Sequence, residues 1–155
     1  MSREEVARIR RMELGVEHCR LEEWEQGLRY LADAFEQGLC KDKGAAVALS
    51  YLGYGLARRQ HKVGEGLAMC KRAVKMEFYQ PEVYLNLSRT LVLAGNRKAA
   101  VDVLKKGLKV DPGDSGLLML RTQLGWRERP VLPFLRRTHP LNRFLGRFRH
   151  AWSSR

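Results

Sequence analysis

The sequence has few cysteines and no long apolar run, and each shortage excludes a class of protein. Its 3 cysteines, Cys19, Cys40 and Cys70, are odd in number and widely spaced, which argues against a disulfide framework or a zinc cluster. No stretch reaches the roughly 18 consecutive apolar residues of a membrane span, and Glu4 and Glu5 stand where a secretory signal would be apolar. We therefore expect a globular, cytoplasmic protein.

Acidic side chains are also in short supply, and their distribution along the chain is uneven. The chain carries 29 Lys and Arg against 17 Asp and Glu, for a net charge of +12. Residues 1–40 are nevertheless acidic on balance, whereas residues 126–155 hold 8 arginines, no lysine and one glutamate. The excess positive charge is thus concentrated in a basic C-terminal tail, which requires its own explanation.

An internal repeat accounts for the rest of the chain. Leu14-Gly15 is followed by Leu52-Gly53 after 38 residues, and by Leu87-Ser88 after a further 35. A second set of small residues recurs with a similar drift, at spacings of 39 and 34. Its members are Gly27 and Ala34, then Gly66 and Ala73, then Ala100 and Gly107. Two independent sets that drift together indicate a repeated unit of about 35 residues.

The last unit, residues 81–114, shows what each repeat builds. Apolar and small residues recur at helical spacing on both sides of Gly95-Asn96, which predicts two helices joined by a tight turn. The small residues permit close approach of the two helices. A hairpin this short leaves an apolar face uncovered, so it is stable only when a neighbouring hairpin packs on it.

These residues resemble the tetratricopeptide repeat family, whose pattern is W-x₂-L-G-x₂-Y…A-x₃-F…P over 34 residues. The places of that pattern in the third repeat are held by Tyr84, Leu87-Ser88, Leu91, Ala100, Leu104 and Pro112. The resemblance implies an all-α, right-handed solenoid of helical hairpins. We expect an array over residues 1–125, with repeats at about 8–41, 46–80 and 81–114 and a closing helix at 115–125.

The resemblance further implies that the first helix of each repeat lines a concave groove that binds a peptide or partner protein. The stripes facing that groove mix apolar residues with arginines, which favours an acidic or carboxylate-bearing peptide. The candidate groove residues are Met12, Val16, Arg20, Tyr54, Arg58, Asn86 and Arg89. Solvated arginines without a ligand are the competing interpretation.

Chaperone-binding members of the family use lysine, arginine and asparagine to clamp a terminal carboxylate. The corresponding places here hold Met12 and Val16, then Tyr51, then Glu82 and Asn86. Cations are missing where the clamp requires them, so a chaperone clamp is disfavoured.

The tail, residues 126–155, predicts a short amphipathic helix at about 140–152, with arginines opposite an apolar stripe. That stripe consists of Leu141, Phe144, Leu145, Phe148 and Trp152. Docking on the apolar closing helix, binding to an anionic membrane surface or a partner protein, and binding to nucleic acid all remain open. The tail also resembles short basic tails of some bacterial tetratricopeptide proteins.

Features of an enzyme are absent from the sequence. Gly53-Tyr54-Gly55 lies within a predicted helix rather than in a phosphate-binding loop, and no histidine has metal-ligand spacing to a second ligand. We therefore expect a non-catalytic protein-binding adaptor without a metal, cofactor or small-molecule substrate. Binding of membranes or nucleic acid through the tail is the alternative.

Overall fold

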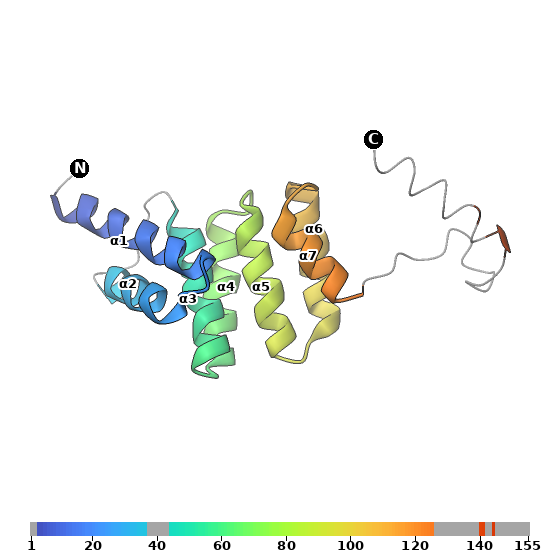
Figure 1. Cartoon of the computed structure of the whole chain (residues 1–155), viewed down its shortest axis with the longest axis horizontal. Coiled ribbons are helices and arrows are strands. Elements are labelled where there is room, and N and C mark those ends of the chain that lie inside the picture. The colour runs from blue at the N-terminus through green and yellow to red at the C-terminus, as the bar shows by residue number, and fades with distance from the viewer. Residues whose placement is uncertain (1–2, 37–43, 126–139, 142–143, 145–155) are drawn as a thin grey trace. The chain divides into compact units, whose positions relative to one another are not determined.

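The computed structural model describes residues 3–36, 44–125, 140–141 and 144 of the chain. Within these residues seven α-helices follow one another, as Figure 1 shows from blue to orange. Their bounds are α1 Arg3–Arg20, α2 Trp24–Glu36, α3 Ala45–Arg59, α4 Val63–Met76, α5 Pro81–Leu93, α6 Arg97–Val110 and α7 Ser115–Gln123. The prediction of an all-α array of helical hairpins is confirmed.

The helices pack in the manner of a repeat array, with each hairpin covered by the next. Helices α1 and α2, α3 and α4, and α5 and α6 form three hairpins, and α7 packs on α5 and α6. The first helices form one continuous layer, since α3 contacts both α1 and α5, and α5 contacts α7. Helices α2 and α4 each also contact the first helix of the following hairpin. The apolar face of one unit is thereby buried by its neighbour.

Glycines allow the two helices of a hairpin to approach closely, most clearly between α3 and α4. A Cβ atom built on Gly66 would lie 2.3 Å from the backbone oxygen of Gly53, and one on Gly53 would lie 2.7 Å from the oxygen of Gly66. Gly15 and Gly27 face one another in the same way across α1 and α2. The small residues that reveal the repeat in the sequence are therefore contact points between helices.

The three hairpin turns share a left-handed backbone conformation that the sequence indicates in only one of them. The middle residue of each three-residue turn has a positive φ, at 64° for Glu22, 57° for His61 and 73° for Gly95. Only the third is glycine, and a left-handed conformation at a residue with a Cβ costs about 1–2 kcal/mol. After the third turn, the Asn96 side chain caps α6 by accepting a hydrogen bond from the Ala99 amide at 3.1 Å.

The chain divides into two units, residues 1–124 and 125–155. Of the amphipathic helix predicted in the second unit, Pro140, Leu141 and Phe144 are among the described residues and have helical backbone. Leu145, Phe148 and Trp152 lie outside the described residues. The amphipathic helix and the function of the tail therefore stay predictions.

Candidate functional site

Two pockets open on the layer of first helices, and together they form the candidate site. The first, here named the α1 pocket, has a cavity volume of about 570 Å³. It is lined mainly by α1, with contributions from the segments that begin α3 and α5. The second, here named the α5 pocket, has a volume of about 280 Å³. It lies among the end of α1, the start of α2, α3, α5 and the start of α7.

Arg20 and Glu82 line both pockets and are bound to each other. The Arg20 Nε atom donates to Glu82 Oε1 at 2.9 Å, and its Nη2 atom donates to Oε2 at 2.6 Å. Tyr51 Oη also donates to Glu82 Oε1, at 2.9 Å. This bidentate pair joins the first repeat to the third, 62 residues away in sequence, and hydrogen bonding to Glu82 raises the pKa of Arg20.

Arginines and aromatic rings form a stack beside the α5 pocket. The Arg58 guanidinium carbon lies 5.4 Å from the Trp24 ring centre and 6.0 Å from that of Tyr54. The Arg89 guanidinium carbon lies 5.6 Å from the Tyr54 ring centre. Trp24 and Tyr54 meet edge to face at 5.3 Å. Such arrangements hold a guanidinium in place while leaving its N–H donors available to an anion.

The three arginines of this surface differ in whether a carboxylate already neutralises them. Arg20 is paired with Glu82, and Arg58 lies 3.4 Å from a Glu22 oxygen. Arg89 is half-buried, and no ion pair of Arg89 occurs among the described residues. Asp114, another acid in the α5 pocket, caps α7 by accepting from the Leu117 amide at 2.8 Å. Arg89 is therefore the cation of this pocket that lacks a counter-ion within the described part of the chain.

A comparison with protein families decides what this architecture is. Residues 57–124 match the tetratricopeptide repeat family. This chain contains tetratricopeptide repeats. The match runs from the end of α3 through α7, and the hairpin of α1 and α2 continues the same packing toward the N-terminus. No curated protein matches the chain.

Arrays of tetratricopeptide repeats generally mediate protein–protein interaction, and the family is typically a non-catalytic scaffold. Among the described residues no group of three His, Cys, Asp or Glu side chains is arranged to bind a metal ion. No helix in the described ranges combines the length and apolar character needed to cross a membrane. Burial raises the pKa of Cys70 to about 11 and that of Cys19 to about 12, which holds both thiols in the unreactive protonated form.

The residues predicted for the groove of this tetratricopeptide array fall into three positions. Met12 and Val16 are buried and form part of the floor of the α1 pocket. Arg20 lies between the two pockets and Arg89 in the α5 pocket. Tyr54 is buried beneath the guanidinium groups of Arg58 and Arg89.

Asn86 lies below the surface rather than on it. Its side chain is 0% exposed, and its Nδ2 atom donates to Ser50 Oγ at 2.9 Å, which joins α5 to α3. Its Oδ1 atom has no hydrogen-bond partner among the described residues. Asn86 therefore does not present a polar group to a ligand in this structure, and its hydrogen bond positions the two helices that carry Tyr54 and Arg89.

Sequence reasoning left Tyr51 and Trp24 out of the groove, although both line the α5 pocket. The pairing of Glu82 with Arg20 was not predicted, because no local pattern connects the two residues. Trp24 begins α2, the second helix of its repeat, and its ring nevertheless extends to Tyr54 on α3. Its position at the turn before a second helix was the available signal.

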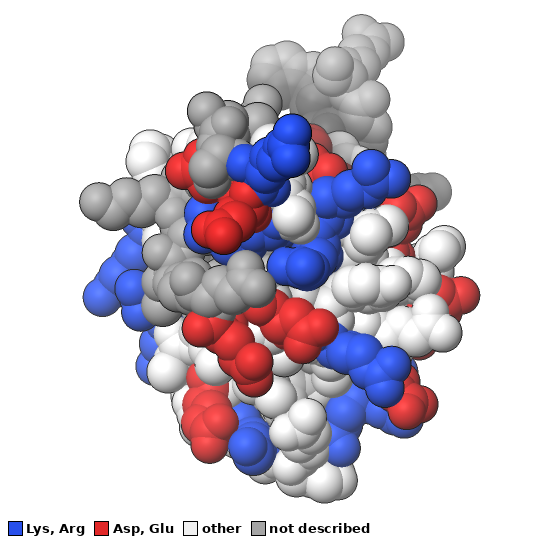
Figure 2. Space-filling view, turned by 90° about the vertical axis from the view of Figure 1, so that its left-hand side faces the viewer, with Lys and Arg blue, Asp and Glu red and all other residues white. Residues whose placement is uncertain are grey.

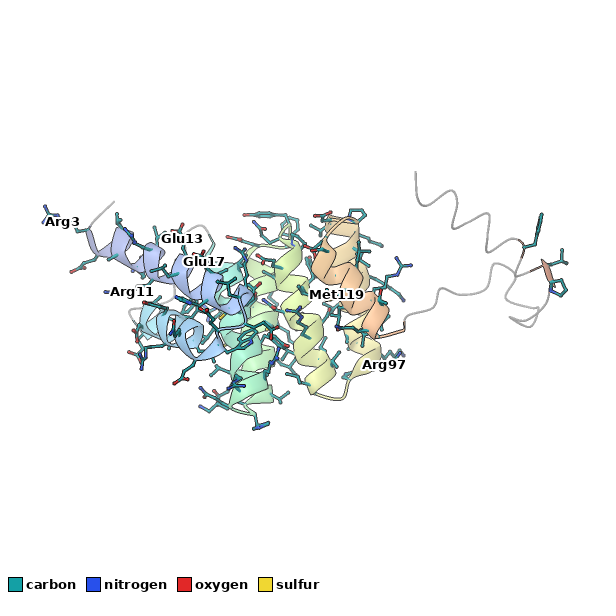
Figure 3. All side chains as sticks on the ribbon, viewed as in Figure 1. Arg3, Arg11, Glu13, Glu17, Arg97 and Met119 are labelled. Atoms are coloured by element: carbon teal, nitrogen blue, oxygen red, sulfur yellow. The ribbon has the colours of Figure 1, made fainter. Side chains whose placement is uncertain are left out.

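The closing helix buries more of its apolar surface than the sequence predicts. Leu117, Leu120 and Leu124 are buried where α7 meets α5 and α6, while Leu118 and Met119 are exposed. Figure 3 labels Met119 at this end of the array. The apolar surface that motivated docking of the tail is thus smaller than the leucine content of the helix suggests.

Proposed function

We propose that this chain is a non-catalytic adaptor that binds a segment of a partner protein across α1, α3 and α5, with a carboxylate of that segment at Arg89. The observation that carries the proposal is the state of the Arg89 guanidinium. It is half-buried on the Tyr54 ring and has no ion pair within the described residues, whereas the arginines near it have theirs.

The energetics favour an anionic ligand at this position. Removing a guanidinium from water has a free-energy cost that a hydrogen-bonded carboxylate offsets, and arginine binds a carboxylate through two parallel hydrogen bonds. The neighbouring acids do not supply that carboxylate, because Glu22 faces Arg58 and Asp114 caps α7. A ligand carboxylate would meet a donor group whose orientation Tyr54 already restricts.

A selection of random displayed peptides on the immobilised full-length chain tests the proposal. We expect the bound sequences to share Asp, Glu or a free C-terminus at one position. The best sequence, made as a fluorescent peptide, should bind Arg89→Ala roughly 10–100-fold more weakly than wild type, since hydrogen bonds to a charged group contribute about 1.5–3 kcal/mol.

Arg72→Ala is the matched control, because Arg72 is an exposed arginine on the second helix α4. It should leave the affinity unchanged. Equal affinity of the Arg89 and Arg72 variants, or enrichment of sequences without an acid, would contradict the assignment of Arg89.

The alternative function belongs to the tail, whose 8 arginines and single glutamate would attract anionic lipid or nucleic acid. On the face of the array in Figure 2, acidic and basic side chains alternate instead of forming a uniform basic surface. Binding of the full chain to anionic vesicles, compared with a Phe144→Ser/Phe148→Ser variant, tests a membrane role. Equal binding of the two proteins, or no binding by either, would exclude insertion of the predicted apolar stripe of the tail into the membrane.

A further inference from the structure

The α1 pocket is the larger of the two pockets that define the candidate site, and its floor is apolar. Met12, Val16 and Val47 are buried there, with Ile9 half-buried at the side. Its volume of about 570 Å³ lies within the range of roughly 300–1,000 Å³ found for ligand-binding pockets. An apolar side chain of a bound segment would therefore find contact surface in this pocket.

Two acidic side chains form the rim of that floor. Glu13 and Glu17 are exposed on α1, one turn apart, and both line the pocket. Figure 3 shows them on the same side of the helix, with Arg11 on the opposite side. Neither forms an ion pair with any of the residues that the structure describes. Two like charges one turn apart repel each other by about 0.2–0.5 kcal/mol, which a nearby cation would relieve.

The third acid of the pocket contributes little free charge, because Glu82 is neutralised by Arg20. The Arg20–Glu82 pair lines both pockets, so it marks the boundary between an acidic apolar pocket and a pocket that holds Arg89. The charged groups without an ion pair among the described residues therefore differ on the two sides of this pair, with Glu13 and Glu17 in the α1 pocket and Arg89 in the α5 pocket. A ligand that crosses the pair would meet the two acids on one side and Arg89 on the other.

We propose that the α1 pocket is a second subsite for the partner segment, and that it takes an apolar side chain flanked by Lys or Arg. The bound segment is then dipolar, with its basic, apolar part on α1 and its carboxylate at Arg89. This inference rests on the proposed function, since it concerns the same bound segment. Charge complementarity with Glu13 and Glu17 selects this occupant over an acidic or uncharged one, and it fixes the direction of the segment.

The test uses the best peptide from the displayed library and four variants of the full-length chain. They are Glu13→Gln/Glu17→Gln, its control Asp33→Asn/Glu36→Gln on exposed positions of α2, Arg89→Ala, and its control Arg72→Ala. We expect Lys or Arg beside an apolar residue in the selected sequences. The Glu13/Glu17 variant should bind the peptide about 2–10-fold more weakly, because exposed pairs contribute about 0.2–1 kcal/mol each.

A charge-swapped peptide, with Glu in place of that Lys or Arg, tests whether the effect of Glu13 and Glu17 depends on the charge of the peptide. The charge-swapped peptide should bind the wild-type chain more weakly than the selected peptide does. On the Glu13/Glu17 variant, the affinities of the two peptides should be nearly equal. Raising the salt concentration should weaken binding of the selected peptide to the wild-type chain and strengthen binding of the charge-swapped peptide, because salt screens both the attraction and the repulsion.

The possible results separate the two proposals. If the Glu13/Glu17 variant binds like its α2 control while Arg89→Ala is still impaired, the α1 subsite is wrong and the carboxylate site stands. If Arg89→Ala binds the peptide as tightly as Arg72→Ala does, the assignment of the carboxylate site to Arg89 is wrong, and the proposed function is contradicted. Displacement of the probe by a synthetic peptide of residues 126–155 would identify the chain's own tail as the occupant and overturn the assignment to a partner.

Discussion

Replacing Gly66 by alanine tests whether the close approach of α3 and α4 is a requirement of this fold. The substitution adds one methyl group, at a position 2.3 Å from the Gly53 oxygen and 3.0 Å from the Ala57 Cβ atom. Both neighbours are fixed, one as backbone and one as the first atom of a side chain. The helices must therefore move apart, and the buried contacts around Cys70 and Ala73 would loosen with them.

Two opposing terms set the size of the effect. Alanine is a better helix former than glycine by about 1 kcal/mol, which favours the variant. Overpacking a tightly packed contact costs about 1–3 kcal/mol, and a clash with backbone falls at the upper end of that range. We expect Gly66→Ala to lower the free energy of unfolding by about 2 kcal/mol and the melting temperature by roughly 8 °C.

Gly64→Ala provides a control on the same helix. Gly64 is exposed on α4, and a Cβ atom built on it meets nothing within 4 Å. This variant gains helix propensity without a clash, so its stability should equal or exceed that of wild type by up to about 1 kcal/mol. Urea denaturation followed by far-ultraviolet circular dichroism measures both variants. A Gly66→Ala protein as stable as Gly64→Ala would refute the argument from close packing.

Three further predictions concern backbone strain, the bridge between repeats and the buried thiols. His61→Gly should raise the free energy of unfolding by about 0.5–1 kcal/mol, because His61 has a φ of 57° and is exposed; a neutral or destabilising effect would remove the strain argument. A double-mutant cycle of Arg20→Ala and Glu82→Ala should give a coupling of about 1 kcal/mol that decreases with salt, and zero coupling would mean that the bridge adds no stability. Cys19 and Cys70 should react with iodoacetamide at pH 8 at least about 100-fold more slowly in the native chain than in urea, because their raised pKa values leave almost no thiolate. Rapid native labelling of their tryptic peptides, measured by mass spectrometry, would contradict their burial.

The fold could be predicted because its contacts repeat at a fixed interval and require particular residue types. Gly53 and Gly66 are glycine because each would otherwise clash with the backbone of the other, so the close approach is visible in the sequence. The left-handed turn residues Glu22 and His61 could not be predicted, because neither residue type marks that conformation. Their equivalence to Gly95 becomes evident only when the three hairpins are compared.

The candidate site was less predictable, because its decisive contacts join distant helices. Arg20 and Glu82 lie 62 residues apart, and nothing in the local pattern of either helix indicates that they meet. Asn86 was expected on an open face of α5, but α5 contacts α3, α4, α6 and α7, so most of its circumference is buried. The helical period identifies which residues share a face, whereas the number of neighbours decides which faces remain open.

Photo-crosslinking of a bound segment most directly tests whether the first helices form the binding surface. A selected peptide with a diazirine on its apolar anchor is irradiated with the full-length chain, and the modified residues are identified by mass spectrometry. The account predicts crosslinks to the floor and rim of the α1 pocket, at Met12, Val16 and Glu17, and their loss in excess unlabelled peptide. Specific crosslinks confined to α2, α4 and α6 would contradict it.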